Sequence, residues 1–204
     1  MKTVLSMPGA PESDLLFGLR MGDEQSQAAV IRQHGPRLLA VAGRFLKDAA
    51  EGREAVREAF ETAFRGSEMH EPPAPLGAWL RRLTVQACAA ALRARARREA
   101  DITPLLPRFD ETGHRLAGQA PTTQPSRAFS DTPENRAHAR ACVDRLPECY
   151  RTPLLLTDVE GYDTTETARL LGLTPDDARQ RLHHARQALC TLLLAPAASP
   201  SSAL

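Results

Sequence analysis

The chain has 204 residues, of which 42% are apolar and 25% are charged. This is the balance of an ordinary globular protein, and it excludes collagen-like, acidic disordered and membrane-bundle classes. The 26 Lys and Arg residues nearly match the 25 Asp and Glu residues, so any affinity for nucleic acid has to come from local basic patches.

Neither a secretory signal nor a membrane span is predicted. Residues 1–13 lack the apolar core of a signal peptide, and the longest apolar tract, residues 191–198, is broken by Pro196. That tract is far shorter than the roughly 20 residues a membrane helix needs. We therefore expect a cytoplasmic protein without membrane insertion.

Composition divides the chain into two helix-rich blocks, residues 14–100 and 132–194. Residues 101–131 between them contain four prolines and no apolar periodicity, a composition that predicts a flexible linker. Residues 1–13 and 195–204 are predicted to be tails. Because no segment alternates apolar and polar residues with a period of two, we expect an all-α protein with two small helical domains.

Three amphipathic helices are predicted in the first block from apolar residues that recur every three or four positions. The buried face of the first is expected to carry Ile31, His34, Leu38, Ala42 and Phe45. The second repeats the pattern with Ala55, Val56, Ala59, Phe60, Ala63 and Phe64. The third starts after a proline cluster that ends at Pro75 and runs through Leu76, Leu80, Leu83 and Ala87 to about Arg98.

The second block opens with Thr132 and Pro133, a hydroxyl residue before proline at the first helical position. The helix that follows is expected to end at Leu146, and the next one to end at Gly161. Pro153 removes a backbone donor within that next helix, which predicts a kink or a late helix start.

Residues 164–194 have the pattern of a helix-turn-helix. Two short helices that cross steeply need small and apolar residues at the crossing and a flexible residue at the turn. Ala168, Gly172, Leu173 and Leu182 have that spacing. The second helix then opens with Thr174, Pro175, Asp176 and Asp177: a capping hydroxyl, a proline at the first helical position, and an acid three residues after the cap.

This second helix is basic on one side, as expected for a helix that reads DNA. Residues 178–194 contain no acid. Basic and polar side chains in such a helix reach base edges and phosphates. The alternative is a solvated basic face on an ordinary helical hairpin. A second basic cluster, residues 92–98, also suits the negative end of a helix dipole.

Catalysis and metal binding find no support in the sequence. Phosphate-binding, nucleophile-elbow and zinc-protease motifs are absent, so the chain is predicted not to be an enzyme. A zinc site is the more specific alternative, because His138 and Cys142 are one helical turn apart. Cys149, His184 and Cys190 lie in the same block of the chain. No compact ligand pair completes it, so we expect free thiols and no cofactor.

Taken together, these segments resemble the extracytoplasmic-function group of bacterial sigma-70 factors. Residues 145–148 (RLPE), 158–161 (DVEG), 168–173 (ARLLGL) and 181–186 (RLHHAR) are similar to the family's region 4. The similarity to the family's region 2 lies in Leu19, Gly22 and Asp23, in residues 54–64, and in residues 78–80 (AWL). The resemblance spans both blocks and leaves out the tails and the linker.

The resemblance implies a sigma factor that binds core RNA polymerase and promoter DNA, with an anti-sigma factor as a further partner. It implies a polymerase-binding face with Glu54, Arg57, Glu58 and Glu61. Contacts with the minus-10 element are implied for Arg82, Gln86, Arg93 and Arg97. The minus-35 element would be read by Arg179, Gln180, Arg181, His183, His184 and Arg186.

The sequence departs from the family pattern at several of these places. Gln86 and Ala90 stand where Asn and Asp are usual, and Asp176 and Asp177 replace residues that are usually small or neutral. Acids at that point repel phosphate. Two other functions therefore remain open: a sigma-like interaction protein without initiation activity, and a plain helix-turn-helix regulator whose first block dimerises.

Overall fold

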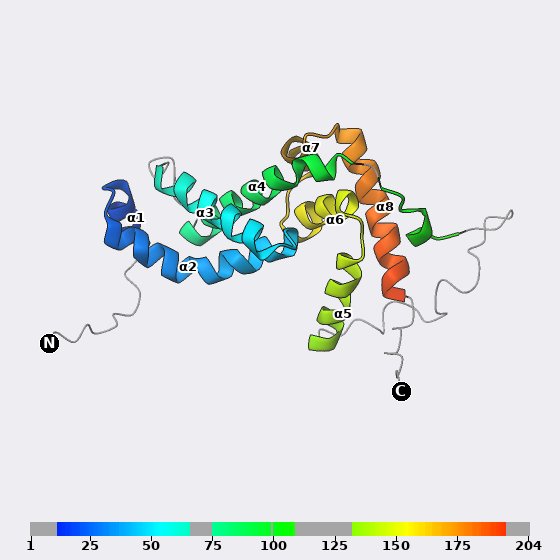
Figure 1. Cartoon of the computed structure of the whole chain (residues 1–204), viewed down its shortest axis with the longest axis horizontal. Helices are drawn as coiled ribbons and strands as arrows, with labels where there is room; N and C mark the ends of the chain where they lie inside the picture. The colour runs from blue at the N-terminus through cyan, green and yellow to red at the C-terminus, as the bar shows by residue number, and fades with distance from the viewer. Residues whose placement is uncertain (1–11, 66–74, 99, 109–131, 195–204) are drawn as a thin grey trace. The chain divides into compact units, whose positions relative to one another are not determined.

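The computed structural model describes residues 12–65, 75–98, 100–108 and 132–194, and every regular element in these ranges is helical (Figure 1). The prediction of an all-α fold is therefore confirmed. The chain forms two compact units that divide between Leu92 and Arg93.

The first unit contains α1 (Glu12–Arg20), α2 (Glu24–Phe45), α3 (Ala49–Arg65) and most of α4 (Leu76–Ala96). The turn between α1 and α2 depends on Gly22, whose φ of 72° is unfavourable for residues with a side chain. Asp23 then caps α2, because its carboxylate accepts a hydrogen bond from the backbone N–H of Ser26 at 2.9 Å. The bonds from Ser26 lower the pKa of Asp23.

The buried side of α2 agrees with the prediction except at one end. Leu38, Ala42 and Phe45 are buried, but Ile31 is 44% exposed and Val30 is buried instead. The prediction was therefore wrong for Ile31. The neighbours of α2 extend to Val30, so the error is one of rotation: apolar periodicity misplaced the packed side by one residue at this end of the helix.

The other two predicted helices of this unit are present. Ala55, Val56, Ala59, Phe60 and Ala63 of α3 are buried. Helix α4 begins at Leu76, as predicted, and ends at Ala96. Leu76 and Leu80 are fully buried in α4, and the buried hydroxyl of Thr84 donates to the Leu80 carbonyl at 2.9 Å.

The second unit contains the last turn of α4, the short 3-10 helix η2 (Thr103–Leu105), and the helices α5 (Pro133–Asp144) and α6 (Glu148–Leu154). The hydroxyl of Thr132 accepts from the N–H of Asn135 at 3.2 Å, so it caps α5 as predicted. Pro153 lies inside α6, and a π-helical turn, η4 (Leu155–Val159), follows directly. The predicted irregularity at Pro153 therefore takes the form of a widened turn.

The core of the second unit includes a residue from the predicted linker. Ile102, 4% exposed, belongs to the same buried cluster as Leu146, Leu154, Leu182 and Leu192. The expectation of a flexible linker from Asp101 onward is therefore wrong for its first residues, because the apolar side chain at position 102 is anchored in this core. Residues 109–131 of the predicted linker lie outside the described residues, as do residues 1–11 and 195–204 of the predicted tails.

No helix in the described part of the chain combines the length and apolar character needed to cross a bilayer.

Candidate nucleic-acid and polymerase interfaces

Two helices of the second unit, α7 (Thr164–Leu171) and α8 (Pro175–Leu194), form the predicted helix-turn-helix. Asp163 and Glu166 form a capping box at the start of α7. Gly172 ends that helix in the left-handed conformation with φ of 64°. At the start of α8, Thr174 Oγ1 accepts from the N–H of Asp177 at 3.1 Å. The predicted turn and cap are both confirmed.

Helix α8 has one buried side and one side that carries the predicted reading residues. The buried side is Ala178, Leu182, Ala185, Ala188 and Leu192. Arg179, Gln180, His183 and Arg186 are exposed, whereas Arg181 and His184 are half-buried. Four of the six predicted minus-35 residues thus lie in solvent on a helix that is fixed by its opposite face.

Each of the three predicted reading arginines has a partner within the chain. Arg179 Nη1 lies 2.8 Å from Asp176 Oδ1. Arg181 donates to the carbonyl of Ala96. The guanidinium of Arg186 donates from Nη2 and Nε to the two carboxylate oxygens of Asp158 at 2.6 and 3.0 Å.

Because of these partners, the three arginines differ in how well they can donate hydrogen bonds to DNA. Arg186 uses two of its donors on Asp158, and Arg181 is half-buried. The Arg179 side chain is 66% exposed. Of the three, Arg179 is therefore the best placed to donate to a base.

The two histidines lie next to each other along α8. The ring centroids of His183 and His184 are 5.9 Å apart, and His184 lies 6.3 Å from the ring of Tyr150. Gln180, Arg181 and His184 border an open hollow of about 370 Å³. The exposed side of α8 is therefore uneven rather than flat.

The predicted minus-10 residues fall into two groups. Arg82 is exposed and Gln86 is half-buried, both in the first unit. Arg93 and Arg97 belong to the second unit, where Arg93 Nε donates to the carbonyl of Leu170 at 2.9 Å. Arg97 lies so close to Gly172 that a Cβ at that glycine would come within 2.5 Å of the guanidinium.

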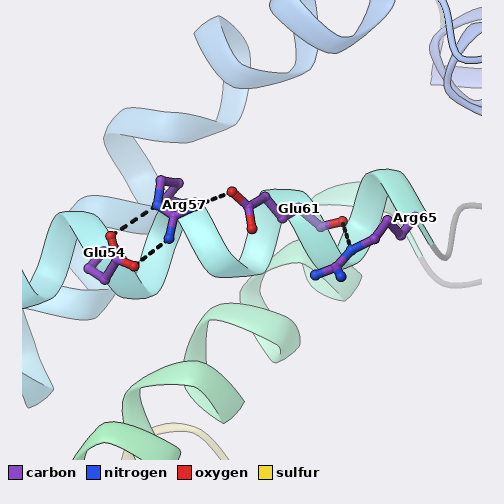
Figure 2. Close-up of polar contacts among 4 residues, drawn as sticks. All are labelled: Glu54, Arg57, Glu61 and Arg65. Atoms are coloured by element: carbon purple, nitrogen blue, oxygen red, sulfur yellow. Dashed lines mark hydrogen bonds and ion pairs between the residues drawn. The ribbon is translucent and has the colours of Figure 1, made fainter.

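The predicted polymerase-binding residues form a charged strip along the exposed side of α3, and Figure 2 shows three of them, Glu54, Arg57 and Glu61, together with Arg65. Arg57 Nε donates to Glu54 Oε2 at 3.0 Å, and the same guanidinium is paired with Glu61. The Glu61 carbonyl in turn accepts from Arg65 at 3.3 Å. The hydrogen bond from Arg57 lowers the pKa of Glu54, and the pKa of Arg57 is raised in return.

This strip keeps a surplus of negative charge. Its four predicted residues are three acids and one arginine, and all four are exposed. Arg57 is held between two carboxylates, whereas Glu58 adds a further acid to the helix. The exposed Arg53 and Arg65 of the same helix balance these acids, so the surface of α3 as a whole carries mixed charge.

Two structurally important residues were not predicted. Asp158, the partner of Arg186, was noted only as part of a motif. Arg151 is 1% exposed, with its Nη1 and Nη2 at 3.4 Å from Asp144 and 3.8 Å from Glu148. The position of Arg151, just before the apolar run 153–156, is a signal that could have identified it. Residues next to such a run tend to be buried, and a buried guanidinium requires acidic partners.

The described residues contain no group of three or more potential metal ligands. His138 Nε2 and Cys142 Sγ lie 3.6 Å apart, so the predicted proximity of this pair is present. Cys142 and Cys149 are buried, and burial raises the pKa of both thiols. These features suit neutral core thiols better than thiolate ligands.

Comparison with protein families finds matches in both units. The family model described as Sigma-70 region 2 matches residues 30–98, and the one described as Sigma-70 region 4 matches residues 138–189. Together the two matches cover more than half of the chain, in the order region 2 then region 4.

Individual relatives agree with these matches. The chain is 27% identical over 180 residues to RNA polymerase sigma-H factor of Pseudomonas aeruginosa, covering 87% of this chain and 91% of that one. It is 26% identical to ECF RNA polymerase sigma factor SigM of Mycobacterium tuberculosis, covering 89% and 84%. For RNA polymerase sigma factor CarQ of Myxococcus xanthus the identity is 26%, covering 85% and 92%.

Among solved structures, the chain is similar to CnrH in complex with the cytosolic domain of CnrY, at 19% identity and a TM-score of 0.45. That match covers 89% of this chain and 96% of the solved one. The sigma factor RpoE of Bartonella quintana, solved with the anti-sigma factor NepR, is 18% identical with a TM-score of 0.44, covering 80% and 93%.

Proposed function

Because the chain belongs to the sigma-70 family, within its extracytoplasmic-function group, we propose that it binds core RNA polymerase and directs it to specific promoters. The observation that carries this function is the order of the two matched regions, the second of which covers α7 and most of α8. Factors of this family are not enzymes, so the prediction that the chain is not an enzyme is confirmed by its family.

Promoter recognition is divided between residues 82–97, in and after α4, and helix α8. Helix α8 reads the minus-35 element, with Arg179, Gln180 and His183 as exposed readers that, in the described part of the chain, are not held by a partner outside α8. Helix α4 contacts the minus-10 element through Arg82, Gln86 and Arg93, and Arg97 directly after the helix adds a fourth contact. The linker joins the region 2-like and region 4-like domains, so that two weak contacts combine through a high effective concentration.

Polymerase binding is assigned to the charged strip of α3. Glu58 offers a test, because it is an exposed acid outside the Arg57 ion pairs. Glu58→Lys reverses the charge at the proposed interface. Glu24→Lys makes the same change at an exposed position of α2, outside the α3 strip. We expect the first to weaken co-elution with core polymerase in gel filtration and the second to leave it unchanged; equal binding by both would exclude the α3 strip.

We propose a cytoplasmic location, because the chain would act where RNA polymerase acts. An anti-sigma factor is proposed as its regulatory partner, in line with the family. Sequestration by such a partner would hold the chain away from polymerase until a signal releases it.

Run-off transcription tests the function directly. Purified chain and core polymerase are combined on a library of fragments from the source genome, with core polymerase alone as the control. Specific transcripts that require the chain are expected, and their start sites would reveal the promoter sequence. Binding to core polymerase without any specific transcript would instead favour a sigma-like interaction protein, and absence of binding would favour a separate DNA-binding regulator.

A further inference from the structure

The first turn of α8 carries an exposed ion pair between Asp176 and Arg179. Asp176 Oδ1 lies 2.8 Å from Arg179 Nη1, three residues along the helix. The two side chains are 86% and 66% exposed. Exposed pairs of this kind contribute little to stability, because water screens them and two long side chains lose freedom. Stability alone therefore places little constraint on this pair.

The neighbouring acid, Asp177, makes different contacts. The carboxylate of Asp177 accepts from the Thr174 hydroxyl at 2.7 Å, and its N–H donates to the same hydroxyl at 3.1 Å. Asp177 therefore belongs to the helix cap. Asp176 is instead directed to Arg179, so the two adjacent carboxylates have separate partners.

A carboxylate here is costly for DNA binding in general, since it repels phosphate. The N-terminal residues of a recognition helix, however, are those that approach base edges in the major groove. An arginine recognises guanine by donating two parallel hydrogen bonds to O6 and N7. That geometry requires the guanidinium to be held in one orientation, which costs a long side chain much of its freedom.

The contact with Asp176 holds the guanidinium of Arg179 in one orientation. It engages Nη1 of Arg179, which leaves the edge formed by Nε and Nη2 to face a base. Arg181 and Arg186 are committed to Ala96 and Asp158, so Arg179 is the arginine of α8 for which orientation matters most.

Building on the proposed function, we propose that Asp176 is a positioning residue for base readout. It holds Arg179 so that Nε and Nη2 donate to O6 and N7 of one guanine in the minus-35 element. The acid thereby lowers affinity for DNA of any sequence and raises discrimination at one base pair.

The test uses the complete chain bound to core polymerase. A promoter found by run-off transcription is prepared with a randomised minus-35 element, and bound fragments are sequenced for each variant. Asp176→Asn and Asp177→Asn each remove one negative charge from the same helical turn, so both relieve phosphate repulsion, but only the first breaks the ion pair with Arg179. Arg179→Ala identifies the base that Arg179 reads, and Asp176→Ala removes the acceptor completely.

We expect the unaltered chain to select guanine at one position and Arg179→Ala to reduce that selection about tenfold. Asp176→Asn and Asp176→Ala should weaken selection at the same position several-fold, the alanine at least as much as the asparagine. Asp177→Asn should keep the selection, and both Asn variants should bind all fragments more tightly to a similar extent.

The inference is overturned if the two Asn variants behave alike, or if Arg179→Ala changes selection at no position. In those cases transcription by the unaltered chain would continue, so the proposed function would stand. If the unaltered chain supported no specific transcript at all, the proposed function would fail, and the inference with it.

Discussion

Arg186, midway along α8, forms a two-point ion pair with Asp158 in the π-helical turn η4, with N–O distances of 2.6 and 3.0 Å. The pair joins the reading helix to a turn that lies 28 residues earlier in the chain. A side chain predicted to touch DNA is therefore engaged in fixing the helix that does so. The distinction between a reading and a positioning arginine can be measured.

Arg186→Ala should lower the free energy of unfolding by about 1 kcal/mol, because a bidentate charge-assisted pair is lost at a partly exposed site. Arg179→Ala, which breaks an exposed pair within one helix, should cost less than about 0.5 kcal/mol. Urea unfolding followed by circular dichroism compares the two. Equal losses would mean that the Asp158 pair does not stabilise the second unit.

The same pair predicts a pH dependence of stability. The hydrogen bond from Arg186 holds the pKa of Asp158 below its ordinary value. Since the folded pKa is lower than the unfolded one, the contribution is complete above the ordinary range of about 4 and is lost as pH falls through the folded value. The stability difference between the unaltered chain and Asp158→Asn should therefore shrink below about pH 4. A difference that stays constant down to about pH 2.5, well below that range, would contradict it.

Gly172 and Gly43 form a matched pair of glycine substitutions. Gly172→Ala should destabilise by about 1–2 kcal/mol, because φ is 64° and the new Cβ would meet Arg97. Gly43→Ala lies within α2, where a Cβ meets nothing within 4 Å, and should stabilise by about 0.5–1 kcal/mol. Thermal unfolding of both variants provides the measurement, and stabilisation by Gly172→Ala would refute the left-handed turn.

Most elements of the fold were predictable because their signals are local, although α1 (Glu12–Arg20) and η2 (Thr103–Leu105) were not predicted. Thr132, Thr174 and Gly172 each mark a helix end through chemistry within a few residues, and the structure places caps or turns at all three. Partners across the fold were not predictable in this way. Neither the pairing of Asp158 with Arg186 nor the anchoring of Ile102 leaves a pattern in the sequence, because each depends on how separate helices pack.

For the candidate site, sequence identified the face of α8 but not the state of its arginines. From the sequence alone, Arg179, Arg181 and Arg186 of α8 are equivalent candidates for DNA contact. Their partners, Asp176, Ala96 and Asp158, lie 3, 85 and 28 residues away. Only the nearest of these could have been inferred from helical spacing.

The four cysteines should differ in reactivity. Cys88, Cys142 and Cys149 are buried, whereas Cys190 is exposed. Burial also raises the pKa of Cys142 and Cys149, which lowers their thiolate fraction near neutral pH. Brief iodoacetamide treatment followed by peptide mass spectrometry should find label on Cys190, with the other three labelled after unfolding in urea. Rapid native labelling of Cys149 would show that the core opens at α6.

Ile102 tests whether the start of the linker is part of the second unit. Its side chain is 4% exposed and packs in the cluster that contains Leu182 and Leu192 of α8. Ile102→Ala should therefore lower the free energy of unfolding by about 2 kcal/mol through lost burial and a residual cavity. Thr103→Ala, at an exposed neighbour, should stay within about 0.5 kcal/mol of the unaltered chain. Urea unfolding distinguishes them, and two equally small effects would mean that the linker begins at residue 101 and contributes no core.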